Sequence, residues 1–317
     1  MISNDIYQAA YLLNSDEVVA VPTETVYGLA GNIYSELAIK KIFEIKKRPF
    51  TNPLIVHVGS LEMAATVVED IPPLAKQLIV AFWPGPLTLV LPKHPSVPSI
   101  ITGGKDTVAI RMPNHPVMLQ LLTLVDYPLA APSANPFGMI SPTSARHVDQ
   151  YFDTVIPMTL DGGECKNGIE STIIGFEEGL PVLYRLGAIS VEDIEREIGE
   201  VRIHNFEEKA PDAPGMMLKH YAPKTTTIVV PDLRNALALH TGKRIGLLVF
   251  DSKMRCKDVV HKERLSKTGD LAEAASNLYA AMHRLDALKL DIIIAEQFPD
   301  NQLGRAINDR LRRASTQ

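Results

Sequence analysis

Residues 46–57 read KKRPFTNPLIVH and mark the point where a helical pattern passes into a buried strand. Because Pro49 disfavours the helical conformation at the residue before it, we expect Arg48 to be extended and the side-chain period to become two. Lys46 and Arg48 would then be exposed on the same side of the chain. Two cations on one face suit a polyphosphate, since each charge-assisted hydrogen bond contributes roughly 1.5–3 kcal/mol. The pair also fits a solvated basic helix end that complements the helix dipole.

A second polar segment, APSANP at residues 131–136, follows an apolar run. Its two prolines hold Ala131 and Asn135 extended, which places Ser133 and Asn135 on one face. From a stiff loop, this hydroxyl and this amide could donate to phosphate oxygens without rearranging first. A proline-rich turn with Ser and Asn as ordinary turn residues is the simpler interpretation of the segment on its own.

The segment from Thr107 to Pro113 alternates as a half-buried strand does, yet it carries a cation, Arg111. A guanidinium on a mostly apolar strand needs an anionic partner. That partner could be an Asp or Glu elsewhere in the chain, or the carboxylate of a ligand.

The composition is that of a globular protein. With 317 residues the chain exceeds the usual size of one domain, so we expect two. A net charge of −5 argues against a nucleic-acid platform over the whole surface, although a local basic groove is compatible with it. The two distant cysteines show no metal spacing and fit a reducing cytoplasm. Without a signal-peptide pattern or an apolar run of roughly 20 residues, we expect a soluble cytoplasmic protein with no membrane contact.

The order of the expected elements predicts two α/β units. In the first unit, Ser35 is expected to cap a helix, and a further helix should start at Ser141. The buried face of the first of these helices is predicted to carry Leu37, Ala38, Ile42 and Phe43. After the first unit, strands at 226–230, 244–250 and 291–295 alternate with helices at 271–288 and 303–313, which predicts a small parallel α/β domain. No GxxxxGK[ST] motif occurs, so an ATP site here cannot be a P-loop.

Several of these motifs together resemble a known family. PTETVYGL at residues 22–29, Lys46-x-Arg48-Pro49, Asn52-Pro53-Leu54 and Ser133-x-Asn135, in this order, are similar to the YrdC-type domain of threonylcarbamoyl-AMP synthases. The likeness spans most of residues 5–205. PGMMLKHYAP at 214–223 and GRAINDRL at 304–311 resemble the linker and the end of the second domain in the long members of that family.

The resemblance implies a fold and a division of the chain. The fold would be a YrdC-like twisted, open α/β sheet with a concave basic face, followed by a smaller, Rossmann-like C-terminal α/β domain. The divisions would be a catalytic domain at 1–208, an interdomain linker that acts as a lid at 209–224, and the C-terminal domain at 225–317. The lid follows from the apolar residues of the linker, which would be costly to leave in water.

The resemblance also implies an activity. Such an enzyme, a nucleotidyltransferase, condenses L-threonine, bicarbonate or CO2, and ATP into threonylcarbamoyl-AMP and pyrophosphate. Magnesium would be bound through the ATP phosphates. The product would feed the tRNA threonylcarbamoyl transferase machinery that makes N6-threonylcarbamoyladenosine, and a weak contact with tRNA itself is compatible with this.

Site residues are carried over by position in the matching motifs. The catalytic residues would be Lys46, Arg48, Ser133 and Asn135. ATP contacts would fall on Arg48, Asn52, Thr107, Ser133, Ser141, Arg185 and Tyr221. Threonine contacts would fall on Thr25, His57, Arg111, Ala131 and Ser171, with Arg111 on the threonine carboxylate, and no protein group would bind a metal. Lys47 departs from the pattern, which usually has a small residue there.

Two other functions remain open from the residues alone. The concave basic face could be a double-stranded RNA or tRNA-binding module without catalysis. Carbamoyl transfer from carbamoyl phosphate, as in related domains of hydrogenase maturation factors, would call for additional zinc-finger and acylphosphatase modules, and this sequence shows neither.

Overall fold

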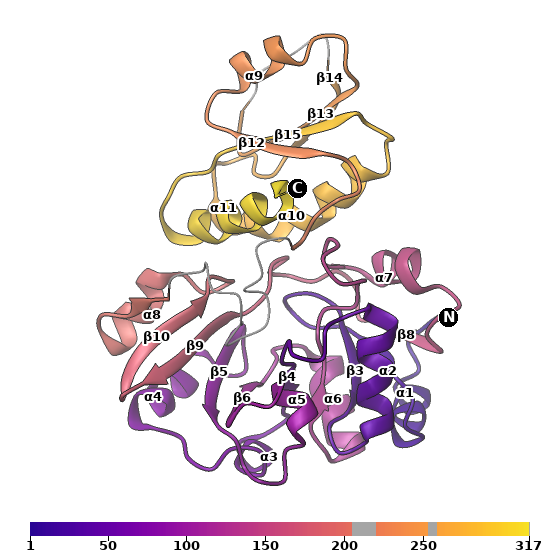
Figure 1. Cartoon of the computed structure of the whole chain (residues 1–317), viewed down its shortest axis with the longest axis vertical. Helices are drawn as coiled ribbons and strands as arrows, with labels where there is room; N and C mark the ends of the chain where they lie inside the picture. The colour runs from indigo at the N-terminus through magenta and orange to yellow at the C-terminus, as the bar shows by residue number, and fades with distance from the viewer. Residues whose placement is uncertain (205–219, 253–258, 317) are drawn as a thin grey trace.

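A computed structural model describes residues 1–204, 220–252 and 259–316 of the chain. Figure 1 shows two lobes, the lower built on an eleven-stranded sheet and the upper on a four-stranded sheet. The predicted pair of α/β units is therefore confirmed.

The first lobe consists of β1 (Ile2–Ser3), α1 (Ile6–Asn14), β2 (Val19–Val21), β3 (Gly28–Asn32), α2 (Glu36–Lys46), β4 (Ile55–His57), α3 (Leu61–Ala65), α4 (Pro73–Phe82), β5 (Leu87–Pro92), α5 (Ser99–Thr102), β6 (Thr107–Arg111), α6 (Pro116–Val125), β7 (Leu129–Ala130), α7 (Ala145–Phe152), β8 (Met158–Leu160), β9 (Thr172–Glu177), β10 (Leu180–Arg185), α8 (Val191–Ile198) and β11 (Arg202–Ile203). The second lobe consists of β12 (Thr227–Val230), α9 (Leu233–Leu239), β13 (Ile245–Val249), β14 (Val259–Arg264), α10 (Leu271–Asp286), β15 (Ile292–Glu296) and α11 (Gln302–Ser315).

The first sheet is mixed, with strand order β1-β8-β2-β3-β7-β4-β6-β5-β9-β10-β11. Near its centre β4 and β6 run parallel, with His57 beside Arg111 in the register. Side chains alternate between the two faces of these strands. Val56 and Ile110 belong to the main hydrophobic core on one face. The opposite face therefore receives His57 and Arg111, which is how the sheet presents two predicted site residues together.

Helix α2 delivers the predicted cationic segment. Ser35 caps it, because its hydroxyl accepts a hydrogen bond from the Ala38 amide at 3.1 Å. Its buried face carries Ile39, Ile42, Phe43 and Lys46 at helical spacing. Leu37, which we expected on this face, is 55% exposed. It lies one step outside the i, i+3, i+4, i+7 stripe, so the expectation was wrong.

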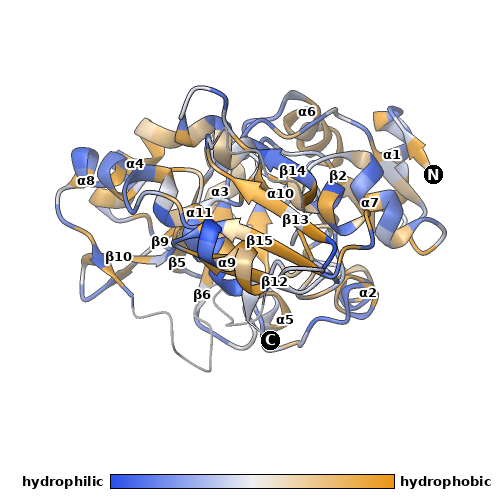
Figure 2. Ribbon diagram, turned by 90° about the horizontal axis from the view of Figure 1, so that it is seen from above, coloured by the Kyte–Doolittle hydropathy of each residue, from blue (hydrophilic) through white to orange (hydrophobic). Residues whose placement is uncertain are grey.

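The second lobe has a wholly parallel sheet with strand order β12-β15-β13-β14. Helices α10 and α11 lie between this sheet and the first lobe, whereas α9 lies on the far side (Figure 1). In the view of Figure 2 the strands β13 and β15 are among the most hydrophobic segments, as expected for a parallel sheet covered on both faces. Strand β14 was not predicted, and α7 begins at Ala145, later than the expected start at Ser141.

The predicted boundary between residues 208 and 209 lies outside the described residues, and the division of the chain stays a prediction in its details. The first sheet ends with β11 and the second begins with β12. In the described part of the chain, no helix is both long enough and apolar enough to cross a membrane. The cytoplasmic location also stays a prediction.

Candidate active site

A pocket opens on the face of the first sheet that carries His57 and Arg111, and mostly buried side chains from distant parts of the chain line it. Nine predicted site residues line this pocket: Thr25, Arg48, His57, Arg111, Ala131, Ser133, Ser171, Arg185 and Tyr221. The other lining residues are Thr23, Val26, Gly28, Ile55, Pro132, Glu170 and His220. Three guanidinium groups in one pocket predict an anionic ligand with several charges.

Lys46 lies beneath the pocket and does not line it. Its side chain is 1% exposed, which contradicts the expected exposed position. The Nζ atom donates to the backbone oxygens of Ser133 and Asn135, at 2.5 Å each. Burial, with the nearby Arg48, holds the pKa of Lys46 well below its usual range. Lys46 therefore connects the motif Lys46-x-Arg48 with the motif Ser133-x-Asn135, and it holds in place the loop that carries Ser133.

Arg48 is also buried, at 7% exposure, instead of exposed as expected. Its Nη2 atom donates to Asn52 Oδ1 at 2.6 Å and to the Pro53 oxygen at 2.8 Å. Its guanidinium lies 5.8 Å from the centre of the Phe137 ring. Burial lowers the pKa of Arg48 to about 9, so the side chain stays charged at neutral pH. Asn52 therefore orients Arg48 and does not itself line the pocket.

Lys47 lies between these two cations in the sequence, and its backbone conformation explains why a small residue is common at this position. It caps α2 in the left-handed region, with φ at 53°, and its side chain is exposed. Glycine adopts this conformation without the steric cost that a side chain brings. The small residue that the family pattern shows here matches that geometry.

Arg111 pairs with a protein carboxylate, one of the two anionic partners considered for a cation on an apolar strand. Its Nη2 atom lies 2.6 Å from Glu24 Oε1, and both side chains are almost fully buried. Its Nη1 atom donates to the Thr25 hydroxyl at 2.9 Å. The contact with Glu24 is close but poorly aligned, because neither Glu24 oxygen accepts a hydrogen bond from any described residue. A ligand carboxylate could therefore still compete for this guanidinium.

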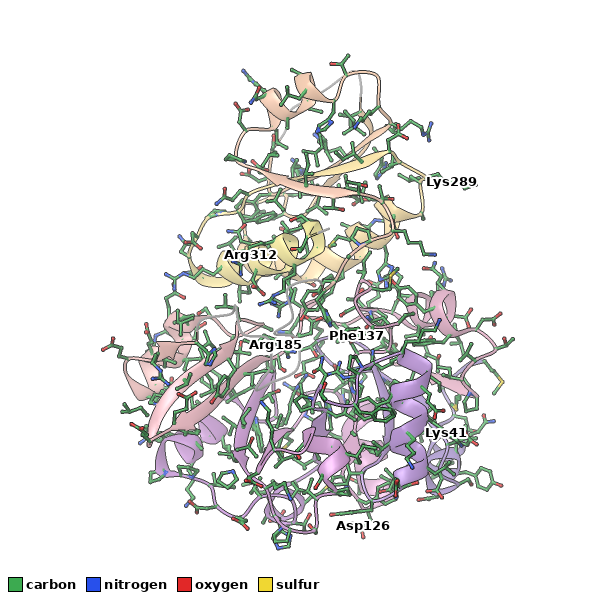
Figure 3. The ribbon with its side chains drawn as sticks, in the orientation of Figure 1. Lys41, Asp126, Phe137, Arg185, Lys289 and Arg312 are labelled. Atoms are coloured by element: carbon green, nitrogen blue, oxygen red, sulfur yellow. The ribbon has the colours of Figure 1, made fainter. Side chains whose placement is uncertain are left out.

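Arg185 and Ser171 form the opposite wall. Arg185 Nη2 donates to the Ser171 backbone oxygen at 2.8 Å and to its hydroxyl at 3.0 Å. The Ser171 hydroxyl also contacts the Thr88 hydroxyl at 2.7 Å. Figure 3 shows Arg185 and Phe137 near the boundary between the two lobes. The wall is thus cross-linked between β5, the residue directly before β9, and β10.

Three further predicted residues lie outside the pocket. The Asn135 side-chain amide donates to the oxygens of Pro136 and Met139, at 2.9 Å each. The Ser141 hydroxyl donates to Glu170 at 2.6 Å. Thr107 lines a separate groove with Tyr184, at the far end of the same face of β6. The roles predicted for these residues in ATP binding or catalysis stay predictions.

Sequence reasoning missed two features of the pocket. Glu170 is its one acidic lining residue in the described part of the chain, although it directly precedes the predicted Ser171. Gly28 is favoured by close packing, because a Cβ atom there would lie 3.0 Å from the Ala131 Cβ atom. A glycine at the end of a polar turn, opposite a proline-bracketed segment, was the available signal for such an approach.

Several buried polar atoms at the pocket have no hydrogen-bond partner among the described residues. They include His57 Nδ1, His220 Nδ1 and the Tyr221 hydroxyl. Buried polar atoms in native proteins are nearly always satisfied. Their convergence on one pocket indicates that a bound ligand or its water completes the site.

The burial of His57 gives a pH prediction. Burial, reinforced by Arg111, lowers the pKa of His57 to about 3, below an unfolded value of about 6.5. The unfolded chain then gains a proton below pH 6.5 that the folded protein does not, so this group lowers stability as the pH falls from 6.5 toward 3. We expect His57→Gln to remove about 2 kcal/mol of the stability lost between pH 7 and pH 5.

Urea unfolding of the wild type and the variant at both pH values measures this difference. The exposed His94 offers a matched control, since His94→Gln makes the same substitution away from the pocket. Identical pH dependence in the wild type and His57→Gln would mean that the pKa of His57 is the same in the folded and unfolded states.

Comparisons with known proteins agree with this geometry. A family model described as telomere recombination matches residues 11–187, and a model for the threonylcarbamoyl-AMP synthase C-terminal domain matches residues 189–316. Threonylcarbamoyl-AMP synthase of Pyrococcus abyssi is 44% identical over 97% of this chain and 93% of its own length. The Bacillus subtilis enzyme of the same name is 41% identical over 98% and 92%, respectively.

One solved structure shows the same two-lobed fold, and another matches part of it. The crystal structure of P. abyssi Sua5 complexed with L-threonine superposes with a TM-score of 0.91 and covers 98% of this chain and 94% of that chain, at 44% identity. Full-length HypF in its phosphate- and nucleotide-bound form matches 58% of this chain and 29% of its own, with a TM-score of 0.52 and 19% identity. That second likeness shows only a shared fold in part of the chain.

Proposed function

Because this chain belongs to the threonylcarbamoyl-AMP synthase family in its two-domain form, we propose that it condenses L-threonine, bicarbonate or CO2, and ATP into threonylcarbamoyl-AMP and pyrophosphate. The reaction is a nucleotidyl transfer. The observation that carries the proposal is the convergence of Arg48, Arg111 and Arg185 with Ser133 in one buried pocket. Such a site suits two anionic substrates that must react with one another.

The chemistry explains why cations dominate. The threonine amine first adds to CO2 and loses a proton to give a carbamate. A carbamate oxygen then forms a bond to the α-phosphorus of ATP, and the bond from that phosphorus to the bridging oxygen of pyrophosphate breaks. Both reactants are negatively charged, so guanidinium groups held in place before the reaction lower the barrier by neutralising charge and fixing orientation. No covalent enzyme intermediate is needed.

The residues divide between the two substrates. Arg111, with Thr25 and His57 beside it, would bind the threonine carboxylate and side chain. Arg48 and Arg185 lie on other walls of the pocket and would bind the ATP phosphates. The buried His57 side chain stays neutral at physiological pH, because its pKa is lowered, and so it offers a hydrogen bond without adding charge.

Magnesium would enter with ATP. The pocket is lined mainly by guanidinium groups and hydroxyls, with one carboxylate, Glu170, and two imidazoles, and the described residues contain no cluster of three or more acidic, His or Cys side chains suited to a metal ion. Magnesium binds through few protein ligands and keeps several waters when substrate phosphates hold it. This donor set fits an ion held by the triphosphate, which would help neutralise the phosphate charge.

The product is a mixed anhydride that hydrolyses readily, so a transferase that acts on tRNA must consume it. The burial of the site favours small substrates over the RNA-binding module considered as an alternative, since a duplex needs an exposed groove. The likeness to HypF concerns the fold and gives carbamoyl phosphate no support.

Pyrophosphate release tests the proposal directly. Purified protein is incubated with ATP, magnesium and each of the twenty amino acids, with and without bicarbonate, and pyrophosphate is measured. We expect release that depends on threonine and on bicarbonate together. Release without bicarbonate would indicate ordinary amino-acid adenylation, and no release with any amino acid would overturn the proposal.

The same assay yields a specificity prediction. Serine lacks one methyl group, which is worth roughly 1–3 kcal/mol in a pocket, so kcat/KM should fall by about 10- to 200-fold. Valine has threonine's shape without the hydroxyl, so it would lose any hydrogen bond that the threonine hydroxyl forms with Thr25 or Ser171. We therefore expect valine to be rejected more strongly than serine. Equal rates with valine and threonine would show that these hydroxyls do not contact the substrate side chain.

A further inference from the structure

Glu170 poses an electrostatic problem in a pocket proposed to bind ATP. It lines the pocket with three arginines and is 6% exposed. An unneutralised carboxylate there would repel a triphosphate through a medium that screens charge poorly. Burial works to raise the pKa of Glu170, but Arg310 and Arg185 hold it below its usual value. Glu170 is therefore an anion inside an anion-binding site.

The second domain supplies most of what surrounds this carboxylate. Arg310 of α11 donates from Nε to Glu170 Oε2 at 2.9 Å. The Tyr279 hydroxyl of α10 lies 2.9 Å and 3.1 Å from the two carboxylate oxygens. From the first domain, Ser141 donates to Oε1 at 2.6 Å, and Arg185 approaches from β10. A charged pair has therefore formed across the boundary between the domains.

Further contacts hold the Arg310 side chain in place beside Glu170. Its side chain is fully buried, and its remaining donors bind Asp309 Oδ2 and the Leu186 backbone oxygen, at 2.7 Å each. Burial opposes its charge, but Tyr221 and Glu170 together hold the pKa of Arg310 above its usual range. Arg310 does not line the pocket, so it acts on the site through its neighbours.

The same guanidinium also supports the aromatic wall. It lies 4.9 Å from the centre of the Tyr221 ring, which stacks on Tyr279 at 5.8 Å. Tyr221 has a φ of 62°, and the next residue, Ala222, donates to the Gly138 oxygen at 2.8 Å. Tyr221 is thus held between the first domain and α10 and α11, with its buried hydroxyl unpaired among the described residues.

We propose that Arg310 is a positioning residue for ATP, supplied by the second domain: it neutralises Glu170 and fixes Tyr221, so that the pocket presents net positive charge to the triphosphate. This inference rests on the proposed function for the identity of the ligand. It assigns the C-terminal domain a direct part in the electrostatics of the first domain's site.

Direct ATP binding tests the inference separately from turnover. Calorimetry with Mg-ATP is performed on the full chain, as wild type, Arg310→Met, Glu170→Gln and the double variant. We expect Arg310→Met to weaken ATP binding by about 10- to 100-fold, and the double variant to recover to within about threefold of wild type. Threonine binding should change little in Arg310→Met, because Arg310 does not line the pocket that holds Arg111 and Thr25.

Recovery in the double variant is the decisive result. If Arg310 acted only by supporting the fold, the folded fraction of Arg310→Met, taken from its melting curve, would bind ATP as tightly as wild type; that result, or a double variant as weak as Arg310→Met, overturns the inference. Should Arg310→Met fail to fold, the double variant still tests the idea, because it contains no uncompensated buried carboxylate at this position. Arg312→Ala is the matched control: Arg312 contacts the same Asp309 but is 66% exposed, and the variant should bind ATP normally.

The pH dependence supplies an independent measurement. Without Arg310, the pKa of Glu170 should rise, because burial favours the protonated acid and Arg185 is then the remaining cation that favours the carboxylate. The other titratable groups that face Glu170 are Tyr221, Tyr279 and His220. Relative to wild type, ATP binding by Arg310→Met should then strengthen as the pH is lowered from 8 to 6 and Glu170 takes up a proton. The double variant should show no such trend relative to wild type. If the ratio of the ATP affinities of Arg310→Met and wild type stayed constant with pH, this would contradict the role assigned to Glu170.

ATP binding with no pyrophosphate release would overturn the proposed function and leave this inference standing.

Discussion

Lys46→Ala should reduce kcat/KM by about 10²–10³ and should also lower the melting temperature by several degrees. The variant removes the donor that both the Ser133 and Asn135 backbone oxygens share. Each buried acceptor left unsatisfied costs about 1–3 kcal/mol, and the loop that presents the Ser133 hydroxyl loses its fixed position. Loss of one preorganised donor in an active site typically costs the same 10²–10³ in rate.

Two companion variants separate the catalytic effect from the loss of packing. Lys46→Met keeps most of the side-chain volume without a donor, so it should lose activity nearly as much as Lys46→Ala while unfolding at a higher temperature. Lys47→Ala removes the exposed neighbouring cation and should be close to wild type in both measurements. Near-normal turnover by Lys46→Met would show that the loop keeps its position without the lysine.

Arg111→Gln should raise the threonine KM by about 100-fold or more and leave ATP affinity nearly unchanged. Glutamine cannot form the charged, two-pronged pairing that a guanidinium offers a carboxylate, and a truncated buried charge pair costs about 2–5 kcal/mol. The substitution also leaves the buried Glu24 carboxylate near the incoming threonine carboxylate. Both effects disfavour the amino acid, and neither acts on the triphosphate.

Calorimetry with threonine and with Mg-ATP, each alone, decides this prediction. Glu24→Gln is the informative control, because it leaves the Arg111 charge in place and removes its protein partner. If threonine competes with Glu24 for Arg111, the control variant should bind threonine at least as tightly as wild type. Equal loss of threonine and ATP affinity in Arg111→Gln would instead identify the Arg111–Glu24 pair as a purely structural ion pair.

Local sequence patterns predicted much of the fold. Apolar periodicity and capping residues such as Ser35 located α2 and most other elements, because those signals act within one or two turns of chain. The alternation of the strand at 107–113 was visible in the sequence, but only the family resemblance brought His57 and Arg111 into one site. The family resemblance then supplied roles that periodicity cannot give, and nine of the residues it named lie around one pocket.

What local patterns could not supply was the partner of each buried charge. Lys46 was expected in solvent because a lysine at a helix end usually is, yet its acceptors lie 87 and 89 residues further along the chain. Arg111 was left with two possible partners, and the structure shows the protein carboxylate, Glu24. Such pairings depend on which distant segments meet in three dimensions, and one sequence does not specify them.

The ion pair between Glu170 and Arg310 has a consequence for synthesis on the ribosome. The two residues are 140 positions apart, so at 5–20 residues per second the carboxylate is made roughly 7–28 s before its cation. During that interval a nascent first domain can form its sheet, but Arg310, the partner of the Glu170 carboxylate in its pocket, has not yet been synthesised. Such a chain must leave Glu170 hydrated or protonated. Full ATP affinity should therefore appear only after α11 has docked, whereas threonine binding does not have to wait for it.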